Sequence, residues 1–429
     1  MKPPSALEYK PRRVHAATLH GMLFAFVTGL LFPQICHAQF SAFAENGAQR
    51  SIATALDRVC GTTAVGALAT QCASFQGALG NGNEGLTLQQ VGHEEYSETR
   101  SLGAERLERQ RRAIAGRLGQ RRDAQESGIG GRDEREPFLS SPPPVGFFFS
   151  PSSTSRDFDG GQREDAYDLD AWGVLAGVDR WISEQVLVGF AVQLEKHALE
   201  FDRAQRVSGG GIEGSSYGAT LYGSTKWRAI QLDASAGVGV TRLSLRRRLL
   251  SQTTNYGLDS EASARTQSRS LHAHVSMSRQ LELGTNTLEP WLDLAYAQTH
   301  VDGFREDGAD GFRLRVSGDD VRSLQSTLGV RLSRPIGTTI GVFRPELRMS
   351  WRHEFLPAAP RVAAAFVSDT SGLRFAPDRA EVDRDHGVLG ISLSWTRPHG
   401  VQPYLDYETV IGRRDVSQHV FRMGLRIEL

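Results

Sequence analysis

The sequence has few lysines, few cysteines and, after residue 40, no long apolar run, and the last of these shortages excludes a class of protein. Only four of its 49 basic residues are lysine, and 49 acidic residues balance them to a net charge of zero. A neutral chain with interspersed acids does not favour nucleic acid as a partner. After residue 40 no run of about 20 apolar residues occurs, which excludes a mature transmembrane helix. A membrane β-barrel is still compatible, because half of each of its strands is polar.

The first 38 residues have the organisation of a secretory signal peptide. Basic residues precede the apolar stretch Gly21–Phe32, which is too short to span a bilayer stably. The tripeptide Cys36-His37-Ala38 then offers small residues at the recognition positions. The sequence therefore predicts a signal peptide over 1–38, with the Sec translocon as a partner; a buried apolar helix is the alternative.

Export leaves two cysteines in the mature chain, Cys60 and Cys72. In an oxidising compartment a disulfide is the expected state of such a pair. A metal site or two free thiols are the alternatives, although no histidine or third cysteine stands at zinc-ligand spacing. Both cysteines fall within residues 39–100, for which helical spacing of the apolar residues predicts a short helical segment.

Residues 101–144 form a predicted Arg-rich helix followed by a Pro-rich joint, SSPPPVG. Within LGAERLERQRRAIAGRLGQRRD, apolar residues recur at Leu102, Leu107, Ile114 and Leu118, a narrow stripe among many charges. After this joint the apolar period changes to two, so we expect a separate β domain over 145–429.

The β domain contains twelve segments in which apolar and polar residues alternate. In FRPELRMSWRHEF (Phe343–Phe355), for example, one face carries Leu347, Met349 and Trp351, and the other is mostly charged. The predicted strands are Val145–Ser152, Tyr167–Trp181, Val186–Leu199, Ser215–Trp227, Ile230–Leu245, Thr266–Leu283, Leu288–Val301, Ser323–Arg334, Phe343–Phe355, Gly387–Thr396, Gln402–Ile411 and Ser417–Leu429.

Three features favour a membrane barrel over a soluble sandwich. The segments are longer than ordinary strands, and tryptophans such as Trp181 and Trp395 stand near their ends. Short connections (Arg228–Ala229) alternate with long ones (Asp302–Asp320). The predicted fold is all-β, a twelve-stranded antiparallel outer-membrane β-barrel in lipid, preceded by a small, mostly helical N-terminal segment. Because a barrel has no edge, we expect the alternating final stretch, FRMGLRIEL, to pair with the first strand.

Several stretches resemble the β-domain of bacterial autotransporters, the type V secretion translocators. They are GVLAGVDRWISEQVLVGFAV, EPWLDLAYAQTHVDGFREDGADGFRLRV, LQSTLGVRLSRPI, FRPELRMSWRHEF and the terminal strand. The upstream QRSIATALDRVC, with the later Arg-rich helix, is similar to the segment that precedes some of these barrels. The resemblance implies a twelve-stranded barrel in the outer membrane of a Gram-negative bacterium, and we expect the barrel to be a monomer. It also implies a linker helix in the pore and a short N-terminal passenger exported to the cell surface.

The resemblance further implies that the β-barrel assembly machinery recognises the last strand. Family members often end in Phe or Trp, whereas this chain ends in leucine. Some members cut themselves at an Asn-Asn pair in the linker, but no asparagine lies between Asn83 and Asn255, so we expect no such cleavage. The predicted assembly signal comprises Phe421, Met423, Leu425, Ile427 and Leu429.

The inward face of the barrel is predicted to be polar and charged. One interpretation is that these residues form ion pairs within the wall; the other is that they line a water-filled lumen that seats the Arg-rich linker. The two are compatible. The predicted pore-lining residues are Asp233, Asp293, Arg331, Arg344, Glu346, Arg348, Arg352, Asp406, Glu408, Arg422 and Arg426, and the predicted linker residues in the lumen are Arg106, Arg109, Arg112 and Arg117.

No motif predicts an enzyme, a cofactor or a metal site. GNGNEG (Gly80–Gly85) has the spacing of a dinucleotide loop, but no strand precedes it, so we interpret it as a turn. His272 and His274 share one strand face, which is more typical of plain wall residues than of metal ligands.

Two alternatives to an autotransporter remain from the sequence. One is a passive channel plugged by the N-terminal helical segment. The other is an omptin-like surface hydrolase, which would need clustered Asp and His at the barrel rim; His300 with Asp302, and Asp385 with His386, are loose candidates.

Overall fold

The structure of the protein is a computed structural model in which one compact unit contains every described residue. The predicted signal peptide and the terminal Leu429 lie outside the described residues, so these predictions stay untested. The described residues are 40–80, 82, 84–130, 145–158, 166–201, 210–249, 260–356, 362–376, 384–397, 401–412 and 418–428.

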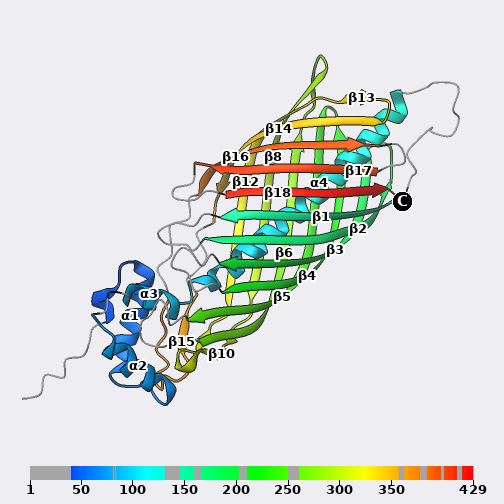
Figure 1. Cartoon of the computed structure of the whole chain (residues 1–429). Helices are drawn as coiled ribbons and strands as arrows, with labels where there is room; N and C mark the ends of the chain where they lie inside the picture. Colours follow the sequence, from blue (N-terminus) through cyan, green and yellow to red (C-terminus); the bar gives the residue numbers. More distant parts are fainter. Residues whose placement is uncertain are drawn as a thin grey trace, which may run out of the picture. The chain divides into compact units, whose positions relative to one another are not determined.

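The N-terminal part is helical, as Figure 1 shows in blue and cyan. The first long helix begins at Gly47 and is capped by Asn46, whose side chain accepts a hydrogen bond from the backbone N–H of Gln49 (2.8 Å). We call residues 40–97 the helical module. Among the helices of the described part, none is long and apolar enough to cross a membrane. The helices are η1 (Phe40–Phe43), α1 (Gly47–Cys60), α2 (Ala67–Gly77), α3 (Glu84–Val91), η2 (Glu94–Ser97) and α4 (Glu98–Gly130).

Twelve antiparallel strands of the described residues close into a barrel (Figure 1). The last strand pairs with the first, Phe421 lying opposite Ser155, so the sheet has no free edge. The barrel strands are β1 (Val145–Phe158), β2 (Tyr167–Trp181), β3 (Val186–Phe201), β4 (Gly211–Trp227), β5 (Ile230–Leu249), β6 (Ser260–Ser278), β8 (Asn286–Val301), β12 (Asp319–Ser333), β14 (Gly341–Glu354), β16 (Asp385–Thr396), β17 (Val401–Ile411) and β18 (Gln418–Glu428).

The structure confirms the predicted fold class and places a strand at each predicted segment. The first strand was predicted too short, because the polar stretch after Ser152 carries no apolar alternation and is held by pairing with β2 and β18 on both sides. The sixth strand was predicted to run to Leu283, but β6 ends at Ser278, and Leu281–Leu283 forms a separate short strand, β7, against β8.

The connections give the barrel two unlike ends. Residues 182–185 join β2 to β3 and residues 228–229 join β4 to β5, whereas residues 302–318 and 355–384 form long loops at the opposite end. We call these the short-turn end and the long-loop end. Strand β1 begins, and β18 ends, at the short-turn end. The long loops also contribute a small sheet of β9 (Phe304–Arg305), β11 (Leu314–Val316) and β15 (Ala364–Phe366).

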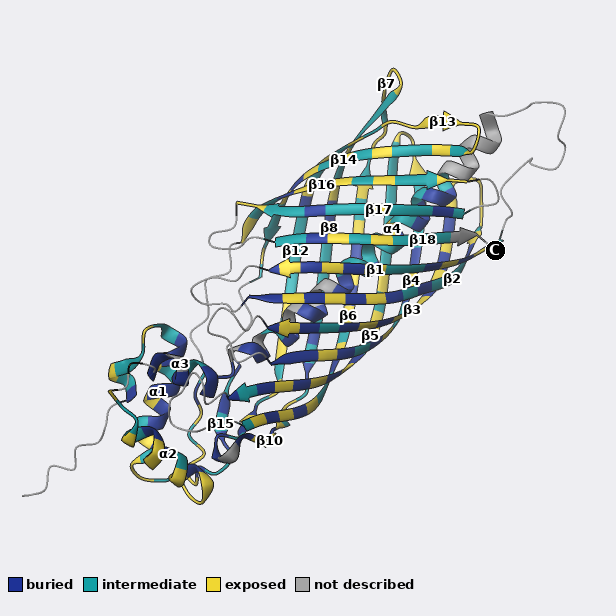
Figure 2. Ribbon diagram, viewed as in Figure 1, coloured by how far each residue is buried: buried dark blue, intermediate teal, exposed yellow. Residues whose placement is uncertain are grey.

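The two faces of the barrel wall differ in polarity, and Figure 2 shows the resulting bands along the strands. On β14, Leu347 and Met349 point outward and are 52% and 59% exposed, whereas Ser350 points inward and is buried. An apolar outer face is what a lipid environment requires. On β18, Phe421 and Met423 lie on this outer face, and Leu425 is half-buried; Ile427 pairs with Phe149 and Val401.

Candidate functional site: a helix held inside the barrel

Helix α4 lies inside the barrel and contacts β4, β5, β6 and β8 (Figure 1, cyan). Near its start, Leu102 is buried in a cluster with Phe158 and Tyr167 of the long-loop end. Further along, Arg117 and Arg121 bind Asp179, two residues before β2 ends at the short-turn end. The helix therefore enters at the long-loop end and runs through the lumen toward the short-turn end.

In the middle of the lumen, arginines of α4 bind carboxylates of the wall. Arg109 forms a two-pronged contact with Glu195 of β3, with N–O distances of 2.6 and 3.1 Å. Arg111 Nη1 lies 2.9 Å from Asp293 Oδ2 on β8. The guanidinium fork suits such paired contacts, and a buried charge requires a partner because its desolvation is costly.

Glu108 connects the helix to the opposite wall. Its carboxylate binds Arg111 (2.7 Å) and Arg112 (2.9 Å) of α4 itself, and it lies 3.3 Å from Arg352 of β14. Arg112 also pairs with Glu408 of β17. These contacts form one network in which Glu108 and Glu408 each neutralise more than one arginine.

Asp179 forms a deeply buried cluster with two arginines of α4. Its carboxylate receives hydrogen bonds from Arg117 Nε (2.7 Å) and Nη2 (3.1 Å) and from the Tyr222 hydroxyl (3.0 Å), and Arg121 Nε lies 3.0 Å away. The side chains of Asp179, Arg117 and Arg121 are almost completely inaccessible to solvent. One residue on, Arg122 reaches Asp233 of β5 at 3.0 Å.

Further ion pairs lie within the wall and join the first network through Arg422, which lies 3.6 Å from Glu408. Arg331 lies 3.1 Å from Glu289 and 3.2 Å from Glu346, and Arg348 bridges Glu346 (2.8 Å) to Asp406. Asp406 also binds Arg422 (2.5 Å). Both sequence interpretations therefore describe real contacts, because some wall charges pair with one another and others hold the helix.

The remaining predicted wall arginines also lie on the inward face. Arg426 donates to Gln402 (2.8 Å), and its guanidinium lies 4.3 Å from the centre of the Tyr404 ring. Arg344 is half-buried, two residues from Glu346 on the same face of β14.

Two glycines make room for guanidinium groups between helix and wall. A Cβ on Gly239 of β5 would lie 2.4 Å from Nη2 of Arg106, a fully buried side chain that also donates to Ser270 Oγ. A Cβ on Gly116 of α4 would lie 2.3 Å from Nη2 of Arg426. Larger side chains at either position would force an arginine to move.

The lumen is not polar throughout, which corrects the sequence expectation. Near the short-turn end Ile114 and Leu118 of α4 pack against an inward-facing apolar patch. The Arg117 guanidinium lies 4.7 Å from the centre of the Phe148 ring within it. A wall that seats a helix can bury apolar side chains of that helix, so the alternation in these strands does not separate apolar from polar residues. The patch comprises Phe148, Leu175, Leu187, Ala191 and Tyr222.

The helical module docks onto the long loops. Ser51 Oγ donates to Ala376 O (2.5 Å), and the backbone N–H of Val65 donates to Ser368 O (3.1 Å). The module and the loops share one apolar core, in which the ring of Phe375 lies 5.4 Å from that of His93.

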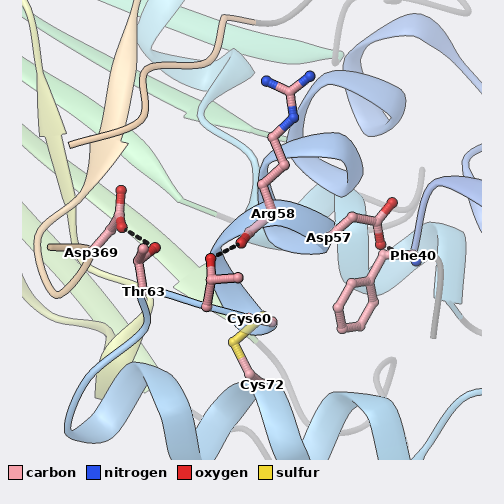
Figure 3. The surroundings of a disulfide bond; sticks show 8 residues. Phe40, Asp57, Arg58, Cys60, Thr63, Cys72 and Asp369 are labelled. Carbon is pink, nitrogen blue, oxygen red and sulfur yellow. Dashed lines mark hydrogen bonds between the residues drawn. A yellow bond between two sulfur atoms is a disulfide. The ribbon is translucent and has the colours of Figure 1, made fainter. Parts of the chain in front are cut away.

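A disulfide between Cys60 and Cys72 links α1 to α2 (Figure 3). Beside it, Thr63 Oγ1 donates to Asp369 Oδ1 (2.5 Å) across the boundary between module and loop. Burial disfavours the charged form of Asp369, but hydrogen bonds from Thr63, Ser371 and Leu373 outweigh it and lower the pKa of this carboxyl.

A buried charge pair also ties the module to the barrel rim. Arg247 of β5 binds Glu306 through two contacts (2.9 and 2.7 Å), and the Tyr96 hydroxyl donates to the same carboxylate. Burial, reinforced by the Glu306 charge, raises the pKa of Tyr96 well above its usual value. Tyr96 therefore stays protonated and acts as a hydrogen-bond donor.

The two histidines considered as metal ligands lie in the barrel wall. His272 and His274 are buried on the inward face, and His274 Nε2 lies 3.7 Å from Asp293. Nowhere in the described ranges do three or more potential ligands come together in a metal-binding arrangement.

Of the two His–Asp pairs considered for a hydrolase at the barrel rim, one has its side chains in contact, whereas in the other the aspartate binds a different histidine. His300 lies 3.3 Å from Asp302 and is exposed to solvent. Asp385 binds His353 at 2.8 Å, and not the adjacent His386 as the loose candidate dyad required.

Two wall partners of α4, Glu195 and Asp179, were not among the residues predicted from the sequence. A signal for Glu195 was present, because exposed Val192 and Leu194 alternate with buried Glu195 and His197. Asp179 had no comparable signal, since its inward neighbours belong to the apolar patch.

Residues 147–408 match the family model described as the autotransporter beta-domain. The translocator domain of the autotransporter NalP from Neisseria meningitidis is 12% identical, with a TM-score of 0.50 over 73% of this chain and 97% of that domain. A comparison with curated protein sequences finds no match.

Two further autotransporter structures are similar. The β-domain of Bordetella BrkA is 18% identical, covering 66% of this chain and 99% of that one with a TM-score of 0.46. The transport unit of AIDA-I from Escherichia coli is 13% identical, covering 69% and 92% with a TM-score of 0.41.

Proposed function

This chain belongs to the autotransporter β-domain family, and from that membership we propose that its outer-membrane barrel carries the helical module, residues 40–97, to the cell surface. The barrel domain is an outer-membrane translocator. The exported segment is short and ends up docked on the barrel that exported it. No catalytic step or cofactor is part of this proposal.

The main observation in support of export is the path of α4 through the lumen. Strand β1 begins at the short-turn end, which faces the periplasm in barrels of this kind, and the module lies at the long-loop end. The connection between them is α4, inside the lumen. A chain that reaches the outer membrane from the periplasm attains this arrangement only if the module crosses with the helix in the lumen. This favours export over a module that stays periplasmic.

The contacts of α4 and of the module support retention after export. Buried ion pairs such as Arg117–Asp179 hold the helix, and the apolar core shared with the loops holds the module. The linker also lacks the Asn-Asn pair at which some family members cut themselves. We therefore propose a surface module that remains attached to its barrel.

Assembly of this arrangement needs other proteins. We propose that the Sec translocon exports the chain and that the barrel assembly machinery engages β18, whose Phe421 and Met423 face outward, 54% and 60% exposed. Because the barrel closes on itself through β1 and β18, one chain suffices for a complete barrel, and we propose a monomer.

Two epitope tags test the export step. One tag is inserted after Gly80, in the exposed turn that follows α2, and a matched tag between Glu184 and Gln185, in the short turn between β2 and β3. On intact cells antibody should label the first tag and not the second, which should become accessible only after the outer membrane is permeabilised. Labelling of the first tag only after permeabilisation would refute export and favour a plugged channel.

A further inference from the structure

Three arginines surround an open hollow of about 380 Å³ between α1 and the loop after β15. Arg50 and Arg58 come from α1, and Arg374 comes from the loop opposite. Among the described residues that line the hollow there is no carboxylate; they are Gly47, Arg50, Ser51, Thr54, Ala55, Arg58, Leu373, Arg374, Phe375 and Ala376. The hollow is therefore a concentrated patch of positive charge in a chain with no net charge.

These arginines differ from those of the lumen. Arginines such as Arg109 and Arg117 are buried against carboxylates, whereas Arg50, Arg58 and Arg374 are exposed. Across the described residues, none of the three guanidinium groups has an ion-pair or hydrogen-bond partner. Figure 3 shows the Arg58 side chain extending away from the disulfide, with no drawn hydrogen bond to its guanidinium.

The walls of the hollow are held in place by the docking contacts. The Ser51–Ala376 hydrogen bond fixes the loop against α1, and buried Ala55 and Phe375 form an apolar floor. Phe375 also exchanges two backbone hydrogen bonds with Ala364 of β15 (2.8 Å each). Arg374 is thereby presented across the hollow from α1 before any ligand arrives, which lowers the entropic cost of binding.

We propose that this hollow binds a saccharide that carries several sulfate or phosphate groups. Guanidinium forks bind such groups through two parallel hydrogen bonds. Arg50 and Arg58 are eight residues apart, roughly 12 Å along the helix axis, so they contact different anionic groups of one ligand. The volume lies within the range of small-ligand pockets, about 300–1,000 Å³, which suits one or two sugar units and not a duplex. The biological source of the ligand rests on the proposed surface location, but the binding itself does not.

Binding is measured on the full-length protein, folded in detergent, by titration calorimetry. The probes are a heparin-derived sulfated tetrasaccharide, a bis-phosphorylated glucosamine disaccharide and a desulfated tetrasaccharide as the neutral control. The test variant is Arg58→Gln/Arg374→Gln, with one substitution on each side of the hollow. The matched variant is Arg305→Gln/Arg315→Gln, which removes the same charge from exposed positions of the small sheet at the same end.

We expect saturable binding of at least one anionic probe, and at least about a tenfold weaker affinity in the test variant, the loss expected from one charge-assisted hydrogen bond. The matched variant should keep the wild-type affinity. Tighter binding of the sulfated probe would indicate an external glycan, and tighter binding of the phosphorylated probe a bacterial surface glycolipid. Absence of saturable binding by the wild type, or equal losses in both variants, would overturn the proposal. Neither result affects the interpretation of the tag experiment, because protein purified in detergent does not report which side of the outer membrane the module occupies.

Discussion

At the scale of single residues, some carboxylates of the lumen each serve more than one arginine. Asp179 neutralises both Arg117 and Arg121, and Glu108 serves arginines of the helix and of the wall. Such pairs are not strong sources of net stability, because desolvation offsets most of the attraction. Loss of the shared carboxylate is destabilising, because it leaves two buried arginines without their partner at once.

Replacing Asp179 by asparagine should therefore destabilise the protein by about 3–5 kcal/mol, the cost of leaving a buried charge unpaired. The measurement is the temperature at which the folded, fast-migrating form is lost on electrophoresis after heating. Asp170→Asn, the same change at an exposed position of the same strand, is the control and should leave that temperature unchanged. Equal behaviour of the two variants would mean that the Asp179 cluster does not hold the helix.

Asp369 makes the contact between module and loop dependent on pH. Its pKa is lowered in the folded protein by hydrogen bonds that the ionised carboxylate accepts. The stability that it contributes is therefore complete above the unfolded value of about 3.9 and is lost as pH falls toward the lower folded pKa.

Hydrogen exchange of the loop peptide around Ser371 and Leu373, corrected for the intrinsic effect of pH, tests this expectation. Protection in the wild type should fall as the pH drops below about 4. In Asp369→Asn the loop should exchange faster at neutral pH, with no further change on acidification. A wild-type loop whose protection is constant over this range would contradict the assignment.

At the scale of elements, α4 depends on its surroundings. Its apolar stripe is narrow, and its arginines are buried only because the wall supplies carboxylates and an apolar patch. The barrel does not depend on the helix in the same way, because its strands pair in a closed ring that includes β1 and β18. Removing α4 should therefore open the pore without opening the barrel.

Deletion of residues 40–130 should raise single-channel conductance in planar lipid bilayers well above that of the full chain. Deletion of residues 40–80 removes most of the module but keeps α4, so its conductance should stay close to the wild-type value. Equal conductance of the two deletions would show that α4 does not obstruct the lumen, and high conductance of the full chain would favour a passive channel.

At the scale of the whole molecule, the module and the barrel loops fold around one another. Their common core contains Phe40 and Phe75 of the module and Phe312, Phe366 and Phe375 of the loops. Neither part would bury these rings alone. We therefore expect the module to be a cap whose fold requires the barrel, and not an independent domain on a tether.

Phe312→Ala should weaken docking by about 3–5 kcal/mol, the range for truncating a buried phenylalanine. Trypsin should then cleave the module of the folded protein faster, while the barrel keeps its heat-dependent mobility. Phe190→Ala, at a position on the outer face that is 43% exposed, is the control and should leave cleavage unchanged. Unchanged cleavage in Phe312→Ala would indicate that the module folds without the loops.

Features that depend on local pattern could be predicted from the residues alone. Alternation with period two located the strands, and the polar member of each alternation identified wall residues such as Asp293 and Glu408. The arginines of the linker were found because seven of them fall within residues 106–122. Which of these charges meet is visible only in the folded barrel.

The reason is that pairing across the lumen joins residues far apart in the chain, and local periodicity carries no information about such pairs. Asp179 was hidden because its inward neighbours are apolar, and their partner is a helix 60 residues away. The docking of Thr63 on Asp369, and the hollow that places Arg58 opposite Arg374, were equally invisible, because loop geometry positions those groups. Periodicity determines which face a residue occupies, and only the closed barrel determines what lies across from it.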